Sequence, residues 1–204
     1  MSAYAVTSDL VDWIDFDSDS TVDNTLLGDL ITRASGVINS YCGRNFDNAS
    51  DLTASARLFD ASSDVMGLTL WLDRDLASPA SDLTITNGDG TSVVNTTVVT
   101  LPSDGPPYYA LKAKASSSTP WTYDSDPEQS ISVTGTWTYQ ALTPDPIKQA
   151  CLRLAQWFYK QRSSDSVSDQ PVVMATGLTI MPAKLPADVL LMLEPYRYLR
   201  MGAA

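Results

Sequence analysis

The chain has 204 residues, 44% of them hydrophobic, with 24 acidic and 13 basic side chains and a net charge of −11. Its apolar runs fall well short of the roughly 20 residues that span a bilayer, and its first residues lack the basic start and apolar stretch of a signal peptide. We therefore expect a soluble protein made in the cytoplasm. Such an acidic chain is a poor wrapper of nucleic acid, because that binding relies on Lys and Arg neutralising phosphates.

The sequence contains no histidine. This removes the commonest general base, the usual Ser and Cys triads and the commonest metal ligand, so we expect neither an enzyme of these classes nor a cofactor. Cys42 and Cys151 cannot by themselves form a disulfide scaffold or a structural zinc site. Both fall in predicted helices beside the apolar stripe, which indicates buried free thiols.

Two helices are predicted at the start of the chain. The first is short and covers Asp9 to Phe16, with Thr7 or Ser8 as its N-cap. The second runs from about Asp23 to Cys42, and Gly43 stands where a left-handed C-terminal cap belongs. Its apolar residues recur at helical spacing, at Leu26, Leu27, Leu30, Ile31, Ala34, Val37, Ile38 and Tyr41.

From Arg44 to about Gln140, turn-forming residues separate short β-prone runs, which predicts a β-rich insertion. The runs are RLFD, LTLWL, SDLTIT, SVVNTTVV, YYALK and ISVTGTWTY. Residues 87–90, Asn-Gly-Asp-Gly, are a hairpin signal. In the last run, Val133, Gly135, Trp137 and Tyr139 alternate as they would on one face of a half-buried strand.

A second long helix is predicted over about residues 146–162, with Asp145 as N-cap and Pro146 at its first position. Its buried stripe comprises Ile147, Ala150, Cys151, Leu154, Ala155 and Phe158. The segment SSDSVSDQP then reads as a flexible polar loop, and Pro186 to Leu199 as a short helix or arm.

The fold class expected from this order is α+β. A small helical core, built on the helices over about 23–42 and 146–162, carries the β-rich insertion between them and a C-terminal arm or helix. Within one domain of residues 1–204, the parts are the N-terminal helices (1–43), the insertion (44–140), the core helix (141–163) and the loop with the C-terminal arm (164–204).

The helix exit Tyr41-Cys42-Gly43-Arg44-Asn45-Phe46 follows the pattern aromatic–x–Gly–Arg–x–Phe. It resembles the helix exit of the head-to-tail connector (adaptor) proteins of tailed bacteriophages. The segment from Val133 to Tyr139, followed by a Pro-rich hinge into a helix, is similar to the family's last strand and core helix. The matching residues there are Gly135, Trp137, Pro146, Ile147 and Ala150. These features follow one another in the family's order and together extend over most of the chain.

The resemblance implies a structural, non-enzymatic virion protein of the neck, assembled in the host cytoplasm. It would form a ring, commonly of twelve subunits, that connects the capsid portal to the tail and continues the DNA channel. Its partners would be the portal protein, further copies of itself and a downstream stopper or tail-terminator protein. DNA would pass through the lumen without specific binding, and no membrane would be involved. A tail-completion or stopper protein is the nearest alternative.

The motif residues also have structural interpretations. Gly43 permits a left-handed backbone, Arg44 is suited to bond the last helix carbonyls, and Phe46 would anchor the chain as it enters the sheet. Gly135 would let a neighbouring backbone or the Trp137 ring approach closely.

Three groups of residues are candidates for assembly or for the channel, each with a plainer alternative. Apolar residues of the C-terminal segment would dock on the portal or on a neighbouring subunit, or else pack on the chain's own core: Leu185, Val189, Leu190, Leu193, Tyr196, Tyr198 and Leu199. Loop acids would line the channel, or else be ordinary solvated residues: Asp15, Asp17, Asp19, Asp165 and Asp169. Aromatic residues of the insertion would meet another subunit, or else form a sheet core: Trp71, Tyr108, Tyr109, Trp121 and Tyr123.

Other functions have weaker support in the sequence. Asp124, Asp126 and Glu128 look like paired carboxylates of a glycosidase, but they lie in a turn-rich segment where Asp is expected. Asp15-x-Asp17-x-Asp19 begins like a calcium loop, yet Ser20 and Leu26 stand where Gly and Glu are required. A carbohydrate-binding β module is a further alternative, against which the two long helices argue.

Overall fold

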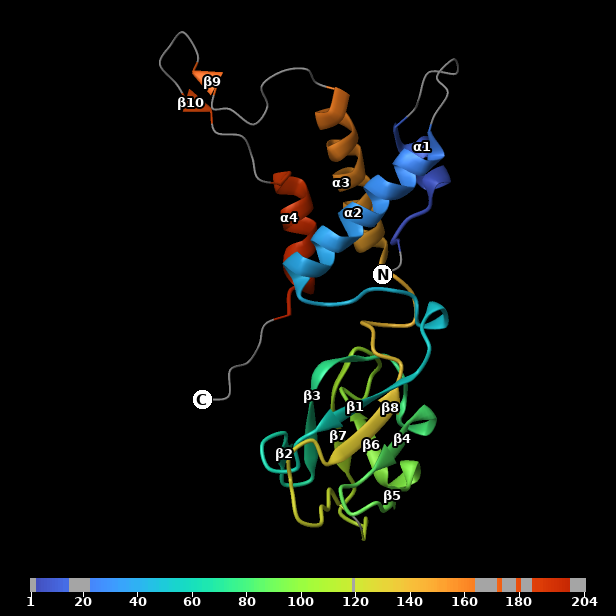
Figure 1. Ribbon diagram of the computed structural model, residues 1–204, viewed down its shortest axis with the longest axis vertical. Coiled ribbons are helices and arrows are strands. Elements are labelled where there is room, and N and C mark those ends of the chain that lie inside the picture. Colours follow the sequence, from blue (N-terminus) through green and yellow to red (C-terminus); the bar gives the residue numbers. More distant parts are fainter. Residues whose placement is uncertain are drawn as a thin grey trace. The chain divides into compact units, whose positions relative to one another are not determined.

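The computed structural model describes residues 3–14, 23–118, 120–163, 172–173, 179–180 and 185–198. The chain forms two compact units, one comprising Met1–Gly43 with Pro144–Ala204 and the other Arg44–Thr143. We call them the helical unit and the β unit (Figure 1). The expected α+β class is confirmed, because a β-rich segment interrupts a set of packed helices.

The helical unit contains α1 (Thr7–Ile14), α2 (Asn24–Cys42), α3 (Asp145–Ser163), α4 (Ala187–Leu193) and a 3₁₀ turn (Glu194–Tyr196). α2 and α3 pack against each other, and α1 and α4 pack against α3. The largest fully buried side chains are those of Leu10, Leu27, Ile31, Ile38, Ile147 and Leu154. A short strand pair, β9 (Val172–Val173) and β10 (Thr179–Ile180), lies in the segment that the sequence predicted to be loop and arm.

The helix ends refine the predictions. Asp23 caps α2 by accepting hydrogen bonds from the N–H groups of Thr25 and Leu26, and Gly43 (φ 66°) donates its N–H to Asn39 O at 2.8 Å. α1 begins earlier than predicted. Val6 occupies the cap position and its N–H donates to the Asp9 carboxylate at 3.2 Å, so Thr7 and Ser8 lie inside the helix. This arrangement is one half of a capping box.

The predicted start of α3 was also one residue late. The N–H groups of Ile147 and Lys148 both donate to the carbonyl of Pro144 at 3.0 Å. Pro144 therefore occupies the cap position, Asp145 lies in the first turn, and Pro146 is the second helical residue. Proline is tolerated there because first-turn N–H groups have no intrahelical partner.

Small side chains line the contact between α2 and α3. The Ser35 hydroxyl donates to Ile31 O at 2.9 Å, lies 3.5 Å from the Cys151 sulfur, and accepts the Tyr4 N–H at 3.1 Å. The prediction of buried free thiols is confirmed for both Cys42 and Cys151. Burial raises the pKa of the Cys151 thiol to about 11, although the Ser35 hydrogen bond opposes the shift. Cys151 is therefore a packing residue rather than a nucleophile.

The β unit consists of two antiparallel four-stranded sheets, one in the order β1-β8-β4-β5 and the other in the order β2-β3-β7-β6. The strands are β1 (Ser55–Phe59), β2 (Val65–Met66), β3 (Thr69–Leu76), β4 (Thr84–Thr86), β5 (Ser92–Val93), β6 (Val98–Leu101), β7 (Tyr108–Ala113) and β8 (Ile131–Gly135). Two 3₁₀ turns lie between strands, at Ala80–Asp82 and Asn95–Thr97, and a third, at Ala49–Asp51, precedes β1.

The two sheets of the β unit share one hydrophobic core. Its cluster takes Phe59, Ile85, Val93, Ile131 and Val133 from the first sheet and Leu70, Leu72, Leu76, Val98 and Leu111 from the second. The unit is therefore a small sandwich, in which one face of each sheet is buried and the other faces outward.

The β-strand predictions were right in location and partly wrong in extent. The hairpin signal at residues 87–90 is confirmed, because it joins β4 to β5 with Thr86 opposite Ser92. The single run SVVNTTVV is instead two strands, β5 and β6, which belong to different sheets. The turn at Asn95–Thr97 redirects the chain between them. The run ISVTGTWTY is a strand only as far as Gly135, so Trp137 and Tyr139 do not continue the predicted alternation.

The two segments that connect the β unit to the helices are bonded to each other. Tyr139 N–H donates to Asn45 O at 2.9 Å, the Thr143 hydroxyl donates to Phe46 O at 2.7 Å, and Ala49 N–H donates to Ala141 O at 2.9 Å. Residues 141–143, which the sequence analysis grouped with the following helix, thus bond within the β unit. Hydrogen bonds within the β unit therefore tie its first residues to its last.

Candidate assembly surfaces

The helix exit at residues 41–46 is a structural junction. Gly43 has the predicted left-handed conformation, and the preceding carbonyl, that of Cys42, accepts the Tyr198 N–H at 2.7 Å. A backbone group of the C-terminal segment thereby satisfies a carbonyl that the helix end leaves without an intrahelical partner. Tyr41 donates its hydroxyl hydrogen to Glu194 at 2.9 Å, and this hydrogen bond raises the pKa of Tyr41.

Arg44 was predicted to bond helix carbonyls, but its clearest partner is a carboxylate of β3. Its Nη1 donates to Asp75 Oδ1 at 2.9 Å, and its guanidinium carbon lies 5.3 Å from the centre of the Tyr139 ring. Asp75 is buried, which raises the pKa of its carboxyl, and Arg44 partly reverses that shift. The pair joins the incoming segment of the β unit to its second sheet.

Phe46 anchors the chain within the β unit, as expected. The side chain is 1% exposed and packs on Tyr139 with ring centroids 5.3 Å apart. Trp137 is half-buried on the same unit, where its indole N–H donates to Ser55 O at 2.8 Å and its ring packs on Phe59.

Gly135 is required for close packing, but its neighbours differ from those predicted. A Cβ at this position would lie 2.8 Å from Leu76 Cδ1 and 2.8 Å from Leu83 Cδ2. The constraint thus comes from two leucine side chains of the sandwich core, not from a backbone or from Trp137. The remaining motif residues are split between core and surface: Ile147 and Ala150 are fully buried in α3, and Pro146 is exposed.

The C-terminal helix contributes to the core of the helical unit. Val189 and Leu193 are fully buried, so the alternative of packing on the chain's own core describes these two side chains. Leu185, Leu190, Tyr196 and Tyr198 are half-buried. Leu191, which the sequence analysis did not name, is the most exposed large hydrophobic residue of this helix at 78%. Leu199 lies outside the described residues.

An ion pair holds α4 against α3. Arg153 Nε donates to Asp188 Oδ2 at 2.8 Å, and this interaction lowers the pKa of the Asp188 carboxyl. On the other side of the unit, Lys148 Nζ lies 2.8 Å from Asp9 Oδ2 and lowers the pKa of Asp9. Both pairs are at the surface, where their contribution to stability is small.

The candidate channel acids Asp15, Asp17, Asp19, Asp165 and Asp169 all lie outside the described residues, as does most of the proposed calcium loop. Their role stays a prediction. Within the described part of the chain, no group of three or more Cys, Asp or Glu side chains is placed to hold a metal ion.

The aromatic residues of the β unit divide into core and surface. Tyr108 and Trp121 are buried, and the Trp121 indole N–H donates to Leu68 O at 2.9 Å. Trp71 and Tyr109 are 43% and 46% exposed and stack on each other, with centroids 5.9 Å apart and ring planes 13° from parallel.

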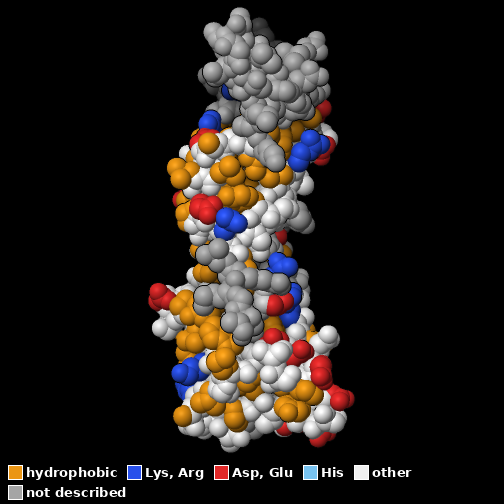
Figure 2. Space-filling model, turned by 90° about the vertical axis from the view of Figure 1, so that its left-hand side faces the viewer, with side chains coloured by type: hydrophobic (Ala, Val, Ile, Leu, Met, Phe, Trp, Pro, Cys, Tyr) orange, Lys and Arg blue, Asp and Glu red, His pale blue; other side chains and the backbone are white. Residues whose placement is uncertain are grey.

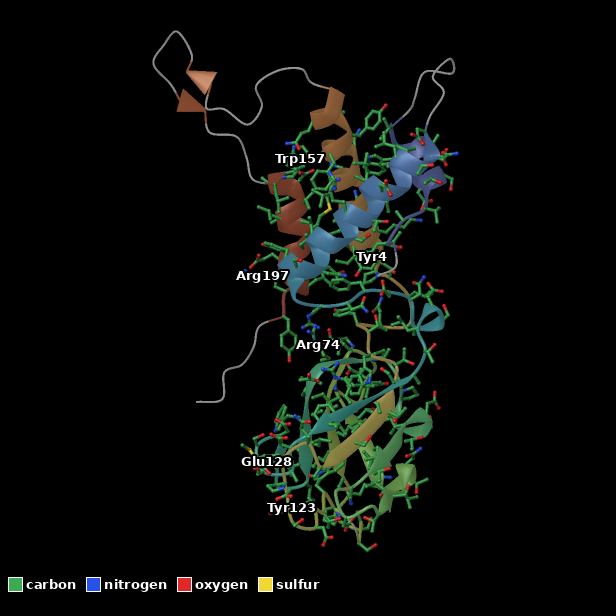
Figure 3. The ribbon with its side chains drawn as sticks, viewed as in Figure 1. Tyr4, Arg74, Tyr123, Glu128, Trp157 and Arg197 are labelled. Atoms are coloured by element: carbon green, nitrogen blue, oxygen red, sulfur yellow. The ribbon has the colours of Figure 1, made fainter. Side chains whose placement is uncertain are left out.

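The arrangement around the paired carboxylates does not favour catalysis. Asp124, Asp126 and Glu128 are exposed, and the neighbouring aromatic residue Trp121 is buried. Figure 3 shows Tyr123 and Glu128 at the surface of the segment that precedes β8.

No described helix combines the length and the apolar character needed to cross a bilayer.

Helices that carry an inserted β sandwich thus define the architecture, and solved structures share it. One similar chain comes from the neck of an empty gene transfer agent particle computed with C6 symmetry, with a TM-score of 0.61 and 13% identity over 98% of this chain and 93% of that one. Another comes from the virion of a native gene transfer agent particle, with a TM-score of 0.60 and 16% identity over 98% and 93% of the two chains. No protein-family model and no curated protein matches the sequence. At this identity, the likeness shows a common fold.

Proposed function

We propose that the protein is a structural, non-enzymatic subunit of the neck of a phage-like particle, where a ring of copies connects the capsid portal to the tail. The observation that carries the proposal is the shared fold over 98% of the chain with a component of a gene transfer agent neck. The match includes both units, so it concerns the whole architecture and not one common module. The helix-exit and core-helix motifs support the same assignment.

The proposed ring has twelve subunits, in keeping with the connector resemblance. The similar neck was computed with C6 symmetry, which is compatible with six or twelve equivalent positions around one axis. The ring contacts the portal on one side and a stopper or tail-terminator protein on the other. Its lumen continues the DNA channel.

The charge of the chain suits a channel that DNA passes without binding. Each copy carries a net charge of −11, so a closed ring presents a strongly negative surface to phosphates. The loop acids Asp15, Asp17, Asp19, Asp165 and Asp169 are the proposed channel-facing residues. The C-terminal residues Leu185, Leu190, Tyr196, Tyr198 and Leu199 are the proposed portal contacts, and the exposed Leu191 joins them.

Deletion of the gene tests this function in the particle. We expect filled heads and complete tails to accumulate unjoined, and purified protein to restore joining when added to the heads. Joined particles in the deletion strain would refute the proposal. A stopper position is distinguished by the partner: a stopper binds heads only after the adaptor ring is present, whereas the proposed adaptor binds isolated portals directly.

A further inference from the structure

The strands of the β unit leave two outward faces, and their composition is unusual for so acidic a chain. Residues paired directly across antiparallel strands point to the same side of a sheet. The register therefore assigns the paired strand residues to the buried core or to an outer face. The pairing of β3 with β7 shifts register between Trp71 and Leu76, so residues in that stretch are placed by their contacts and exposure instead.

The outer face of the first sheet is uncharged and carries mainly small side chains. Thr86 lies opposite both Ser92 and Ser132, Thr84 lies opposite Thr134, and Leu58 lies opposite Ser132. The alternate residues of these strands, such as Ile85 and Val133, are buried in the core. We call this surface face A, defined by Leu58, Thr84, Thr86, Ser92, Ser132 and Thr134. Its side chains are small hydroxyls and one leucine that is 55% exposed.

The outer face of the second sheet is apolar and aromatic. Met66 lies opposite Thr69, Trp71 opposite Ala110, Val99 opposite Lys112, and Leu101 opposite Ala110. Tyr109 joins them through its stack on Trp71. We call this surface face B, defined by Met66, Trp71, Val99, Leu101, Tyr109 and Lys112. Met66 is 74% exposed, and Lys112 supplies a positive charge.

The strands that form the two faces carry few acids. The strands β1 to β8, all within the described residues, contain two acids, Asp73 and Asp75, and each is paired with an arginine. Asp73 is half-exposed, and its charge is balanced by Arg57 of β1. The other acids of the unit lie on its connections. Among them, Asp64 accepts the Trp71 N–H through its carbonyl, and its carboxylate accepts the Asp60 N–H at 2.9 Å. Figure 2 shows hydrophobic side chains gathered on the β2 side of the β unit and acidic ones toward a margin.

This distribution matters because copies with a net charge of −11 repel one another. A contact between copies requires surfaces from which acids are absent, and the cores of protein interfaces are depleted of charged residues. A ring further requires two different patches on opposite sides of each subunit, because its contacts are head to tail. The outward faces of the sandwich meet both conditions.

We propose that face B of one copy packs against face A of the next copy, so that the β units form the contact between neighbours in the ring. The aromatic pair Trp71 and Tyr109 anchors the contact against the hydroxyl-bearing side chains of face A. This inference rests on the proposed function, because it assigns the interface of that ring.

Substitutions that place an acid on each face test the inference with the full chain. Thr84→Glu blocks face A and Trp71→Glu blocks face B, and Ser125→Glu adds the same charge on an exposed connection as the control. Each variant is incubated with isolated portal and imaged, and oligomers are weighed by mass photometry. We expect wild type and the control to form rings on the portal. Each face variant should lose every species larger than a monomer.

Mixing the two face variants provides the sharpest readout. The Thr84→Glu chain keeps a working face B and the Trp71→Glu chain keeps a working face A, so the mixture should stop at dimers. Dimers of either variant alone would overturn the head-to-tail arrangement. If Trp71→Glu or Thr84→Glu lowers the melting temperature, Met66→Glu and Leu58→Glu replace them at other exposed positions of the same faces.

The outcomes separate the inference from the function. Rings formed by both face variants would refute the proposed interface and leave the connector role standing. If the face variants form normal rings that no longer join tails, another neck component covers face B. That result would also refute the proposed interface between copies. Failure of wild type to bind the portal would refute the proposed function, and this inference with it.

Discussion

The helical unit and the β unit reach stability by different routes. The helical unit is assembled from both ends of the sequence: α1 and α2 come before the insertion, α3 and α4 after it, and surface ion pairs connect Asp9 to Lys148 and Arg153 to Asp188. The β unit is one continuous segment whose incoming and outgoing strands are hydrogen-bonded, and its principal ion pair, Arg44 with Asp75, is largely buried.

This difference indicates that the insertion is a self-closed module, whereas the helical unit depends on long-range contacts. A chain excursion whose ends are already tied together adds little loop-closure cost to the helices that flank it. Each unit has its own hydrophobic core. Damage to one core is therefore expected to remain in that unit.

The largest effects should come from cavities in the two cores. Leu193→Ala in α4 and Leu111→Ala in β7 remove fully buried side chains and should each cost about 2–5 kcal/mol. Both native thiols belong to the helical unit. Leu193→Ala should therefore speed thiol labelling, and Leu111→Ala should speed amide exchange in the β unit while leaving labelling unchanged.

Leu191→Ala is the matched control, because the same helix holds this leucine 78% exposed. Its cost should be below about 0.5 kcal/mol. If Leu111→Ala accelerated thiol labelling as much as Leu193→Ala does, the two units would unfold together, and the comparison would fail.

The second effect concerns the buried ion pair of the β unit. Arg44→Met leaves the Asp75 carboxylate without its partner and should cost about 3 kcal/mol at neutral pH. Burial already places the pKa of Asp75 above its ordinary value of 3.8, and loss of Arg44 raises it further.

A raised folded-state pKa gives stability that is full below the unfolded value and is lost as pH rises through the folded value. The loss of unfolding free energy caused by Arg44→Met should therefore become smaller as pH falls toward the acid side of that window. Urea titrations at several pH values measure this loss. The double variant Arg44→Met/Asp75→Asn lacks the titrating group, so its deficit relative to Asp75→Asn should not follow pH. A deficit in Arg44→Met that is constant with pH would contradict the assignment.

The third effect is an overpacking test of the sandwich. Gly135→Ala places a Cβ 2.8 Å from two leucine methyl groups and should cost about 2 kcal/mol in the β unit. Leu83→Ala is itself destabilising, because Leu83 is buried, but the double variant should lose less than the sum of the two single losses, since one clashing group is gone. Thermal unfolding of the single and double variants measures this difference, and strictly additive losses would argue against the contact.

The smallest effect is expected at the surface of the helical unit. Asp188→Asn removes the ion pair with Arg153, which should quicken amide exchange in α4 at low salt and make no difference at high salt. The pKa of Asp188 is lowered, so this contribution is present above its ordinary value of 3.8 and lost as pH falls below it. An equal change at high salt would indicate lost packing instead of lost charge.

Local signals in the sequence predicted much of the fold. The period of apolar residues and the caps at Asp23 and Gly43 located α2, and turn residues located most strands. Which sheet a strand joins depends on partners far away in sequence, so the division of residues 92–101 between two sheets could not be read locally. For the same reason, the contact of Arg44 with Asp75 and the leucines around Gly135 were missed.

The candidate surfaces were less accessible to sequence analysis. Apolar content alone did not separate Val189 and Leu193, which are buried, from Leu191, which is not. A signal for face A was present in the alternations Thr84-x-Thr86 and Ser132-x-Thr134, since uncharged alternate residues mark an outward face without acids. For face B, the aromatic content of the insertion predicted that Trp71 and Tyr109 would either meet another subunit or form a sheet core. Local sequence could not show that the two rings stack, because they come from strands that are distant in the sequence.

Cryo-electron microscopy of this protein mixed with the isolated portal of its particle tests the central claim most directly. The account predicts a closed ring of this chain seated on the portal, with its axis along the DNA channel and the β units in contact between neighbours. A protein that leaves the portal bare at saturating concentration would contradict the connector role.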